Sequence, residues 1–355
     1  MAEELYRQLQ ERLNMYSLGF PATKSGIEIR IMQKLFNPED AEIFLALSPK
    51  LEKPGDVAER IGKSAEEAAK ILEDMARRGL LFRMVKDGTA SYGAIPFMHG
   101  IMKFQVKRYD RELADMMEQY FSDGFHEAIA ANAGLFLRTI PVGESVSPEY
   151  HVAAFEDAME ILRNAPVIAV SECICRKEKK TIGKGCDKPH ENCFMFGSMA
   201  RYYIDNGLGR QVGLEEAIEI VLASQKAGLV TQPGTAQNPA GMCNCCGDCC
   251  GVLAAVKRDP RPASLVFSNF QAAVAADQCS GCGACLDRCQ MEALALDGNG
   301  TAEVNLNRCI GCGLCITECP TGALALAPRS GQERRVPPRT SGEQMMMIAK
   351  NRGIL

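Results

Sequence analysis

A repeated cysteine run in the C-terminal part of the chain constrains its fold more than any other sequence feature. Both runs have the spacing C-x2-C-x2-C-x3-C, and their surroundings also match, since CSGCGACLDRCQMEALAL aligns with CIGCGLCITECPTGALAL. Zinc knuckles use separate CxxC pairs, and disulfide-forming cysteines do not repeat in this way, so the pattern favours iron–sulfur ligation. The eight cysteines are Cys279, Cys282, Cys285 and Cys289, and then Cys309, Cys312, Cys315 and Cys319.

Over about residues 275–327 the sequence resembles the bacterial ferredoxins that carry two [4Fe–4S] clusters. The resemblance implies crossed ligation, because the fourth cysteine of each run lies too far along the chain to close its own loop. Gln290 departs from the family, which usually has Pro there, whereas Pro320 keeps it. The expected ligand sets are Cys279, Cys282, Cys285 and Cys319 for one cluster, and Cys309, Cys312, Cys315 and Cys289 for the other.

The other nine cysteines form two groups upstream of the repeated runs. Thiolates packed so closely repel each other unless a metal shares their charge, so we expect at least one further iron–sulfur cluster here. The alternatives are buried thiols without a ligand and a zinc site, in which Cys173, Cys175 and Cys186 are joined by Cys193 or His190. The groups are Cys173, Cys175, Cys186 and Cys193, and then Cys243, Cys245, Cys246, Cys249 and Cys250.

The pattern CxCR…C…C followed by CNCC-x-x-CC resembles uncharacterised 4Fe–4S binding proteins in which this domain precedes a two-cluster ferredoxin. The resemblance implies clusters without a defined reaction. Adjacent cysteines such as Cys245 and Cys246 cannot easily bind one cubane, because their side chains diverge. Each pair is therefore expected to divide between two sites or to leave one thiol free, and a free thiolate beside a cluster could take part in thiol–disulfide or substrate chemistry.

The N-terminal part reads as helices followed by a hairpin. Asn37 and Pro38 predict a helix start, and Ser64 with Glu67 forms a capping box for a helix that ends at Gly79. The expected helices cover 38–47, 54–61 and 64–78, and the expected strands cover 80–86 and 90–95. Over about 60 residues this order resembles a winged helix-turn-helix.

Charge argues against DNA recognition by this unit. Its reading helix would be 64–78, which carries more acidic than basic side chains. Because phosphate neutralisation supplies most DNA affinity, an acidic reading helix is a poor DNA ligand. DNA is therefore not an expected partner, and the unit is expected to have a docking or structural role.

Further expectations concern the connecting segments. Residues 96–120 read as one long helix, 149–163 as an amphipathic helix and 166–171 as a short apolar strand that leads into Cys173. Helices are expected near 193–206 and 214–227, and 259–262 reads as a linker. The basic tail is expected to be extended, and either solvated or packed along its own domain or a partner.

These elements predict an α+β multidomain protein: an α-rich N-terminal part with a winged helix-turn-helix, a mixed α/β cysteine-rich middle domain and a two-cluster ferredoxin-like module. The expected segments are N-terminal helices at 1–35, the winged-helix-like unit at 36–97, a helical connector at 98–165, the cysteine-rich metal or Fe–S domain at 166–258, the ferredoxin module at 270–327 and the basic tail at 328–355.

Composition limits the expected partners and cellular compartment of the chain. The formal net charge of −4 gives no general attraction to nucleic acid, and no apolar run is long enough for a membrane span. The charged N-terminal stretch does not read as a signal peptide, so the chain is expected to be cytoplasmic, where seventeen cysteines indicate metal ligation. Exposed low-potential clusters suggest anaerobic conditions.

The expected function is cytoplasmic electron transfer among two [4Fe–4S] clusters, a further Fe–S centre or zinc, and an oxidoreductase partner. We see no Gly-rich dinucleotide fingerprint, so no NAD or flavin site is expected. The chain therefore reads as an electron-transfer component more than a stand-alone enzyme, and it could form a homo-oligomer. The alternatives are a redox-responsive winged-helix transcription regulator and a reductase that acts on a small substrate at the middle-domain centre.

Overall fold

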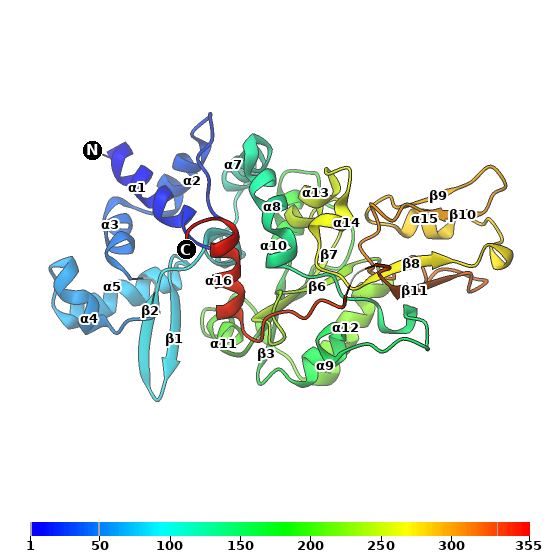
Figure 1. Ribbon diagram of the computed structural model, residues 1–355. Coiled ribbons are helices and arrows are strands. Elements are labelled where there is room, and N and C mark those ends of the chain that lie inside the picture. The colour runs from blue at the N-terminus through cyan, green and yellow to red at the C-terminus, as the bar shows by residue number, and fades with distance from the viewer. Residues whose placement is uncertain (1, 49, 332) are drawn as a thin grey trace.

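Figure 1 shows the computed structural model, which describes residues 2–48, 50–331 and 333–355. The protein is mixed α/β, with a helical N-terminal part at one end, a sheet flanked by helices in the middle and a ferredoxin-like module at the other end. Among the described residues, no helix combines the length and the apolar character needed to cross a bilayer.

Local capping sets the helix ends of the N-terminal part. Asn37 accepts a hydrogen bond from the Asp40 amide at the start of α3, and Ser64 forms the expected capping box with Glu67 at the start of α5. The expected helices and hairpin are present, while their assignment as a winged helix-turn-helix stays a prediction. The elements are α1 (Ala2–Asn14), α2 (Ile27–Leu35), α3 (Pro38–Ala46), α4 (Pro54–Ala58), α5 (Ala65–Arg77), β1 (Phe82–Lys86) and β2 (Thr89–Gly93).

The expectation of a single long helix over 96–120 is wrong. A π-helical turn and the short α6 end at Phe104, and a new helix begins only after Asp110, whose side chain accepts a hydrogen bond from the Leu113 amide. Asp110 thus supplies a second N-terminus within the segment. The elements are the π-helical turn Phe97–Ile101, α6 (Met102–Phe104), α7 (Arg111–Tyr120) and α8 (His126–Phe136).

The helix expected over 149–163 starts later, at Ala158. The Phe155 carbonyl accepts hydrogen bonds from the buried Arg138 guanidinium, so it is not available to a helix. Asp157 then caps α9 (Ala158–Arg163) by accepting hydrogen bonds from the Met159 and Glu160 amides.

A five-stranded antiparallel sheet in the order β5-β3-β4-β7-β6 forms the middle of the molecule. The helix expected near 193–206 starts later, because Cys193 lies in β4, which pairs with β3. The strands are β3 (Ile168–Glu172), β4 (Glu191–Phe196), β5 (Arg210–Gln211), β6 (Val230–Pro233) and β7 (Gly241–Cys245), and the helices are α10 (Ile174–Thr181), α11 (Gly197–Asp205), α12 (Leu214–Lys226) and α13 (Gly251–Lys257).

The ferredoxin-like module consists of two small antiparallel pairs, β8 with β11 and β9 with β10. The Asp297–Gly300 turn joins β9 to β10, as the sequence predicts. The expected linker is partly helical, because Pro262 occupies the first position of α14. The elements are α14 (Pro262–Leu265), β8 (Phe270–Val274), α15 (Ala284–Arg288), β9 (Leu294–Leu296), β10 (Ala302–Val304) and β11 (Leu324–Pro328).

The basic tail packs along its own chain, and the expectation that it is extended throughout is wrong. Arg335 lies over the Phe267 ring, and Arg334 pairs with the buried Glu156. After this stretch Thr340 caps a helix, α16 (Ser341–Asn351), which returns across the molecule between the N-terminal part and the sheet (Figure 1). Gln344 ties α16 to the end of α8 by donating hydrogen bonds to the Leu135 and Phe136 carbonyls.

Candidate metal centres

The repeated runs bring four cysteines around one enclosed cavity. Its lining includes Cys289 from the first run together with Cys309, Cys312 and Cys315 from the second. Backbone amides face two of these sulfur atoms, since the Ala293 N–H donates to Cys289 Sγ at 3.2 Å and the Ala272 N–H donates to Cys309 Sγ at 3.4 Å. Four thiols and inward N–H groups around one cavity are the donor set that a cubane requires.

The other four cysteines form a second set near the surface. Burial raises the pKa of the Cys285 thiol, and the neighbouring thiolates Cys282, Cys279 and Cys319 raise it further. Gly281 approaches the Gly300 carbonyl so closely that a Cβ would lie 2.5 Å from its oxygen, which explains why this loop needs glycine. Cys282 is exposed, so this set lies at the edge of the module.

Six of the nine upstream cysteines line a single apolar chamber, which we call the six-cysteine chamber. It lies between the end of β3, the strands β4 and β7 and the start of α13. Neighbouring cysteines influence one another's pKa in the order Cys173, Cys175, Cys250, Cys245, Cys243 and Cys193. The lining cysteines are Cys173, Cys175, Cys193, Cys243, Cys245 and Cys250.

A lysine and a histidine from the broken helical segment reach the same chamber. Lys103 Nζ lies 3.5 Å from both Cys193 Sγ and Cys243 Sγ. Burial alone would lower the pKa of Lys103, but the charge interactions with Cys193 and Cys243 outweigh it and raise this pKa well above its ordinary value. Burial lowers the pKa of His99 to about 4, helped by the charge of Lys103, so His99 is neutral at pH 7.

A second upstream group lies beside the chamber, and we call it the Cys186 group. Its ligand atoms all lie within 4.8 Å of one another, which suits one metal ion. Asp248, a short exposed side chain two residues from Cys246, was not expected at a metal site, although an acid within a cysteine run is a signal that sequence reasoning could use. The group consists of Cys186, Cys246, Asp248 and Cys249.

In each pair of adjacent cysteines, one side chain lines the six-cysteine chamber and the other belongs to the Cys186 group. Cys245 faces the chamber and Cys246 the Cys186 group, and Cys250 and Cys249 divide in the same way. The expected zinc set does not form one site, because Cys173, Cys175 and Cys193 line the chamber whereas Cys186 lies with Cys246. The side-chain ligand atoms of His190 belong to neither group.

A fully buried arginine lies between the six-cysteine chamber and the Cys186 group. Arg176 donates to the Asn244 carbonyl at 3.1 Å and approaches Cys246 Sγ at 3.8 Å. Burial alone would lower the pKa of Arg176, but the charges of Cys173 and Cys246 outweigh it and raise that pKa. The CxCR pattern contains this arginine, so the sequence carried a signal for it.

The ferredoxin-like module docks directly on the Cys186 group. The Gln290 side chain accepts a hydrogen bond from the Gly247 amide at 2.7 Å, and a Cβ on Gly247 would lie 2.6 Å from the Gln290 carbonyl oxygen. Arg288 donates to the Gln225 and Lys226 carbonyls at the end of α12. The residue that departs from the ferredoxin pattern is thus the one that joins the module to the cysteine-rich part.

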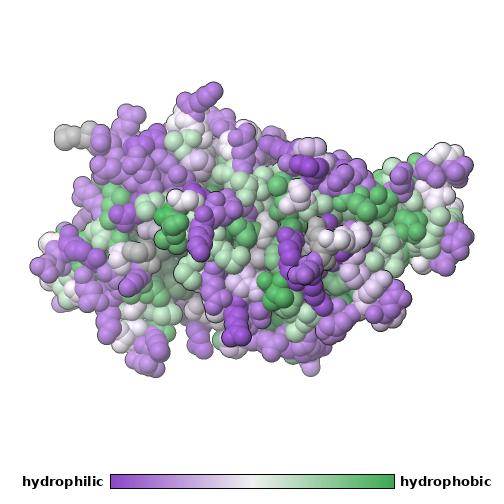
Figure 2. All heavy atoms as spheres, viewed as in Figure 1, coloured by the Kyte–Doolittle hydropathy of each residue, from purple (hydrophilic) through white to green (hydrophobic). Residues whose placement is uncertain are grey.

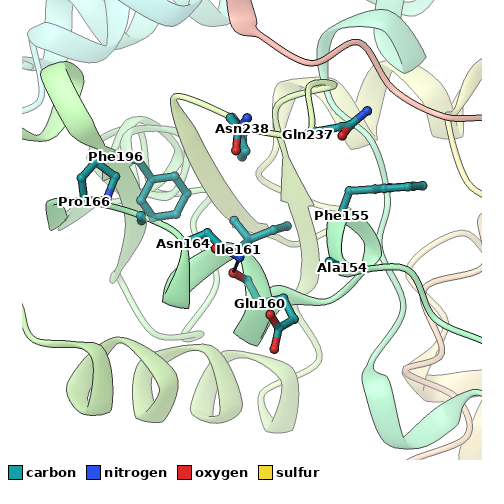
Figure 3. A pocket seen from close by; sticks show the side chains of 11 residues that line it. Ala154, Phe155, Glu160, Ile161, Asn164, Pro166, Phe196, Gln237 and Asn238 are labelled. Carbon is teal, nitrogen blue, oxygen red and sulfur yellow. Dashed lines mark hydrogen bonds between the residues drawn. The ribbon is translucent and has the colours of Figure 1, made fainter.

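A larger cavity, of about 440 Å³, lies away from these cysteines (Figure 3). Phe155 and Ile161 line it together with the amides Asn164, Gln237 and Asn238, and its one carboxylate, Glu160, pairs with Arg163. None of the residues that line it is a cysteine or a histidine. It has no evident connection to the metal chemistry.

Comparison with known proteins agrees with the C-terminal assignment. The family model of the 4Fe-4S dicluster domain matches residues 278–323. No curated protein and no solved structure matches the chain. The match indicates 4Fe–4S cluster binding by this segment, and together with the cysteine groups it points to iron–sulfur electron transfer.

Proposed function

We propose that the chain is an electron-transfer protein in which two [4Fe–4S] clusters of the ferredoxin-like module exchange electrons with a further centre in the six-cysteine chamber and with an oxidoreductase partner. The observation that carries the proposal is the contact between Gln290, next to Cys289, and Gly247, next to Cys246. It brings the ligand-rich loops of the two domains together within one chain.

The crossed ligand sets would hold the clusters. Cys289, Cys309, Cys312 and Cys315 line one cavity, and Cys285 has Cys279, Cys282 and Cys319 as neighbours, which supports the crossed pairing. When bound, the clusters supply one-electron oxidation and reduction. The protein offsets their negative charge with amide donors such as those of Ala272, Ala293 and Ala302.

The two cluster sites face different surroundings. The set that includes Cys282 lies at the surface, whereas Cys309 and Cys315 are buried. Figure 2 shows apolar side chains gathered over the ferredoxin-like module, at the right of the molecule. The module exposes Leu296 and Leu306, so a redox partner would dock beside the exposed set, while the buried set faces the rest of the chain.

The Cys186 group would hold a further metal between the module and the six-cysteine chamber. Three thiolates and a carboxylate suit a single zinc or iron ion. Its place beside the Gln290 contact supports a position along the route between the two domains. If the bound ion is zinc, the site is structural. Metal analysis identifies the ion.

The contacts of the helical N-terminal unit favour a structural role over DNA binding. The basic side chains of α5 are paired with acids of the same unit, as in Lys70 with Glu66 and Arg77 with Glu73. On the cysteine-rich side, the Tyr202 hydroxyl donates to the Ala76 and Leu81 carbonyls. The unit would therefore brace α11, and a gel-shift assay with the chain's own promoter region tests the regulator alternative, for which we expect no shift.

Anaerobic metal analysis combined with EPR tests the main proposal. Protein purified without oxygen should contain more than eight irons and matching sulfide, and low-potential reduction should give signals beyond those of the two ferredoxin clusters. Rapid-freeze EPR after mixing with a low-potential donor should then show the chamber centre re-equilibrating with these clusters. A chamber centre that stays redox-silent while both ferredoxin clusters are fully reduced would limit electron transfer to the C-terminal module.

A further inference from the structure

A second cavity shares a wall with the six-cysteine chamber. It has a volume of about 210 Å³, and both cavities are lined by His99, Lys103 and Cys243. An apolar cavity of about 150 Å³ is large enough for a benzene ring. A small organic molecule could therefore lie against the same side chains that close the chamber.

The rest of this cavity is mostly apolar, comes from five parts of the chain and includes the polar side chains of Ser341 and Gln344 from α16. Ile95, Phe136 and Met195 form much of its wall, and the Phe136 ring packs against the His99 ring at an angle of 48°, with centroids 4.0 Å apart. Met345 closes the cavity from α16. A hydrated inorganic anion would find few donors on such walls, whereas an apolar body would bury surface against them.

Lys103 gives the cavity one positive end. An ammonium group has three N–H donors, and two of the Lys103 donors are directed at Cys193 and Cys243. The third is available to a ligand in the adjoining cavity. Tyr203 also lines the cavity close to Lys103, and its hydroxyl has no hydrogen-bond partner among the described residues. One cation and one free hydroxyl at one end of an apolar space fit a carboxylate head.

The wall formed by α16 is fixed rather than loosely attached. Gln344 donates to the carbonyls at the end of α8, and Arg352 at the other end of the helix donates to the Ser17 and Asn14 carbonyls. These contacts hold Met345 against the cavity and leave Met346 exposed to solvent. The cavity is therefore preformed, which favours binding of a small rigid ligand.

We propose that this cavity binds a small monocarboxylate with an apolar, ring-sized body, whose carboxylate contacts Lys103 beside the six-cysteine chamber. The proposal deepens the proposed function and rests on it for the presence of a redox centre behind Cys243. It places a small molecule in the cavity next to that centre, on the other side of the shared wall.

Isothermal titration calorimetry of the full chain, purified anaerobically, tests the proposal with three probes. Benzoate has both the head and the body, acetate has only the head, and benzyl alcohol has the body without the charge. Benzoate should bind at least tenfold more tightly than either of the others. Equal affinities for benzoate and benzyl alcohol, or for benzoate and acetate, would overturn the proposal.

Two methionines of α16 provide matched variants. Met345→Trp fills the cavity and should weaken benzoate binding at least tenfold, whereas Met346→Trp changes an exposed position on the same helix and should leave it unchanged. Lys103→Met should reduce benzoate affinity to that of benzyl alcohol, while Lys103→Arg should retain part of it. Unchanged benzoate binding by Met345→Trp would show that the ligand lies elsewhere.

Iron content and EPR spectra of the same samples separate this inference from the proposed function. If the chamber holds no iron and benzoate still binds with the expected pattern, the proposed chamber centre is wrong, electron transfer is limited to the C-terminal module, and the cavity assignment stands. If iron and EPR signals are as proposed and benzoate does not bind, the cavity assignment alone is wrong.

Discussion

Lys103 Nζ lies 3.5 Å from Cys193 Sγ, although 90 residues separate them in the chain. A cation at this position stabilises thiolate and cluster charge, so it should favour the more negative, reduced state of a centre in the chamber. Lys103→Met should shift the midpoint potential of that centre to more negative values by tens of millivolts. EPR-monitored redox titration measures the shift.

Lys103→Arg keeps the charge and serves as the matched control. Its midpoint potential should stay close to that of the unaltered protein. The ferredoxin clusters should keep their potentials in both variants, since Lys103 lies against the chamber. Equal potentials for Lys103→Met and Lys103→Arg would mean that the charge of Lys103 does not act on the centre.

Crossed ligation predicts which cluster each fourth cysteine supports. Cys319→Ala should damage the cluster of Cys279, Cys282 and Cys285, because Cys319 is a neighbour of Cys285. Cys289→Ala, the matched change in the other run, should damage the cluster of Cys309, Cys312 and Cys315. EPR signals assigned to the two clusters distinguish these outcomes, and loss of the opposite cluster in each case would contradict the crossed assignment.

Mutation of the Cys186 group should remove its metal without removing the centre in the chamber. Changing Cys246 and Cys249 to Ser should remove one metal ion per chain, because these two residues supply half of the ligand atoms. The chamber centre should remain, since Cys245 and Cys250 face it instead. Elemental analysis identifies the lost ion as zinc or iron. Loss of four or more irons would show that the two groups form one centre.

The Gln290 contact should hold the ferredoxin-like module against the Cys186 group. Gln290→Ala removes the acceptor of the Gly247 amide and should cost about 1 kcal/mol of docking stability. Hydrogen exchange in the segment 246–250 should become faster. Glu303→Ala is the control, because this side chain is exposed on β10 of the same module. Equal exchange in both variants would remove Gln290 from the docking interface.

Glu73 should make the stability of the N-terminal unit depend on pH. Partial burial alone would raise the pKa of Glu73, but hydrogen bonds from Arg77, Tyr92 and Arg83 outweigh it and lower that pKa below its ordinary value. The carboxylate therefore stabilises the fold above the unfolded-state pKa, about 4.3, and this contribution is lost as the pH falls through the lower folded-state pKa.

Glu73→Gln should accordingly lower the melting temperature at pH 7, and the difference from the unaltered chain should shrink toward pH 4. Circular dichroism of the helices at both pH values measures it. Glu66→Gln is the matched control, because the Glu66–Lys70 pair is exposed on the same helix and should change little. A deficit for Glu73→Gln that is as large at pH 4 as at pH 7 would contradict the assigned ionisation.

Features that depend on neighbouring residues could be predicted from the amino-acid sequence. The capping box of Ser64 and Glu67 and the Asp297–Gly300 turn follow from local chemistry, and both lie where the residues predict them. The eight-cysteine repeat predicted the module that the family comparison identifies, because cluster ligation needs a fixed spacing along the chain.

Contacts between residues far apart in the chain could not be predicted in this way, because they depend on how the whole chain packs. The helical pattern over 96–120 did not predict the break in the helix that brings His99 and Lys103 to the chamber. The composition of the tail did not predict that Met345 lines the adjoining cavity. Local sequence specifies helix ends and turns, because these depend on hydrogen bonds within a few residues. The division of nine cysteines between two places depends on how the strands and helices pack, and that packing sums contacts from the whole chain.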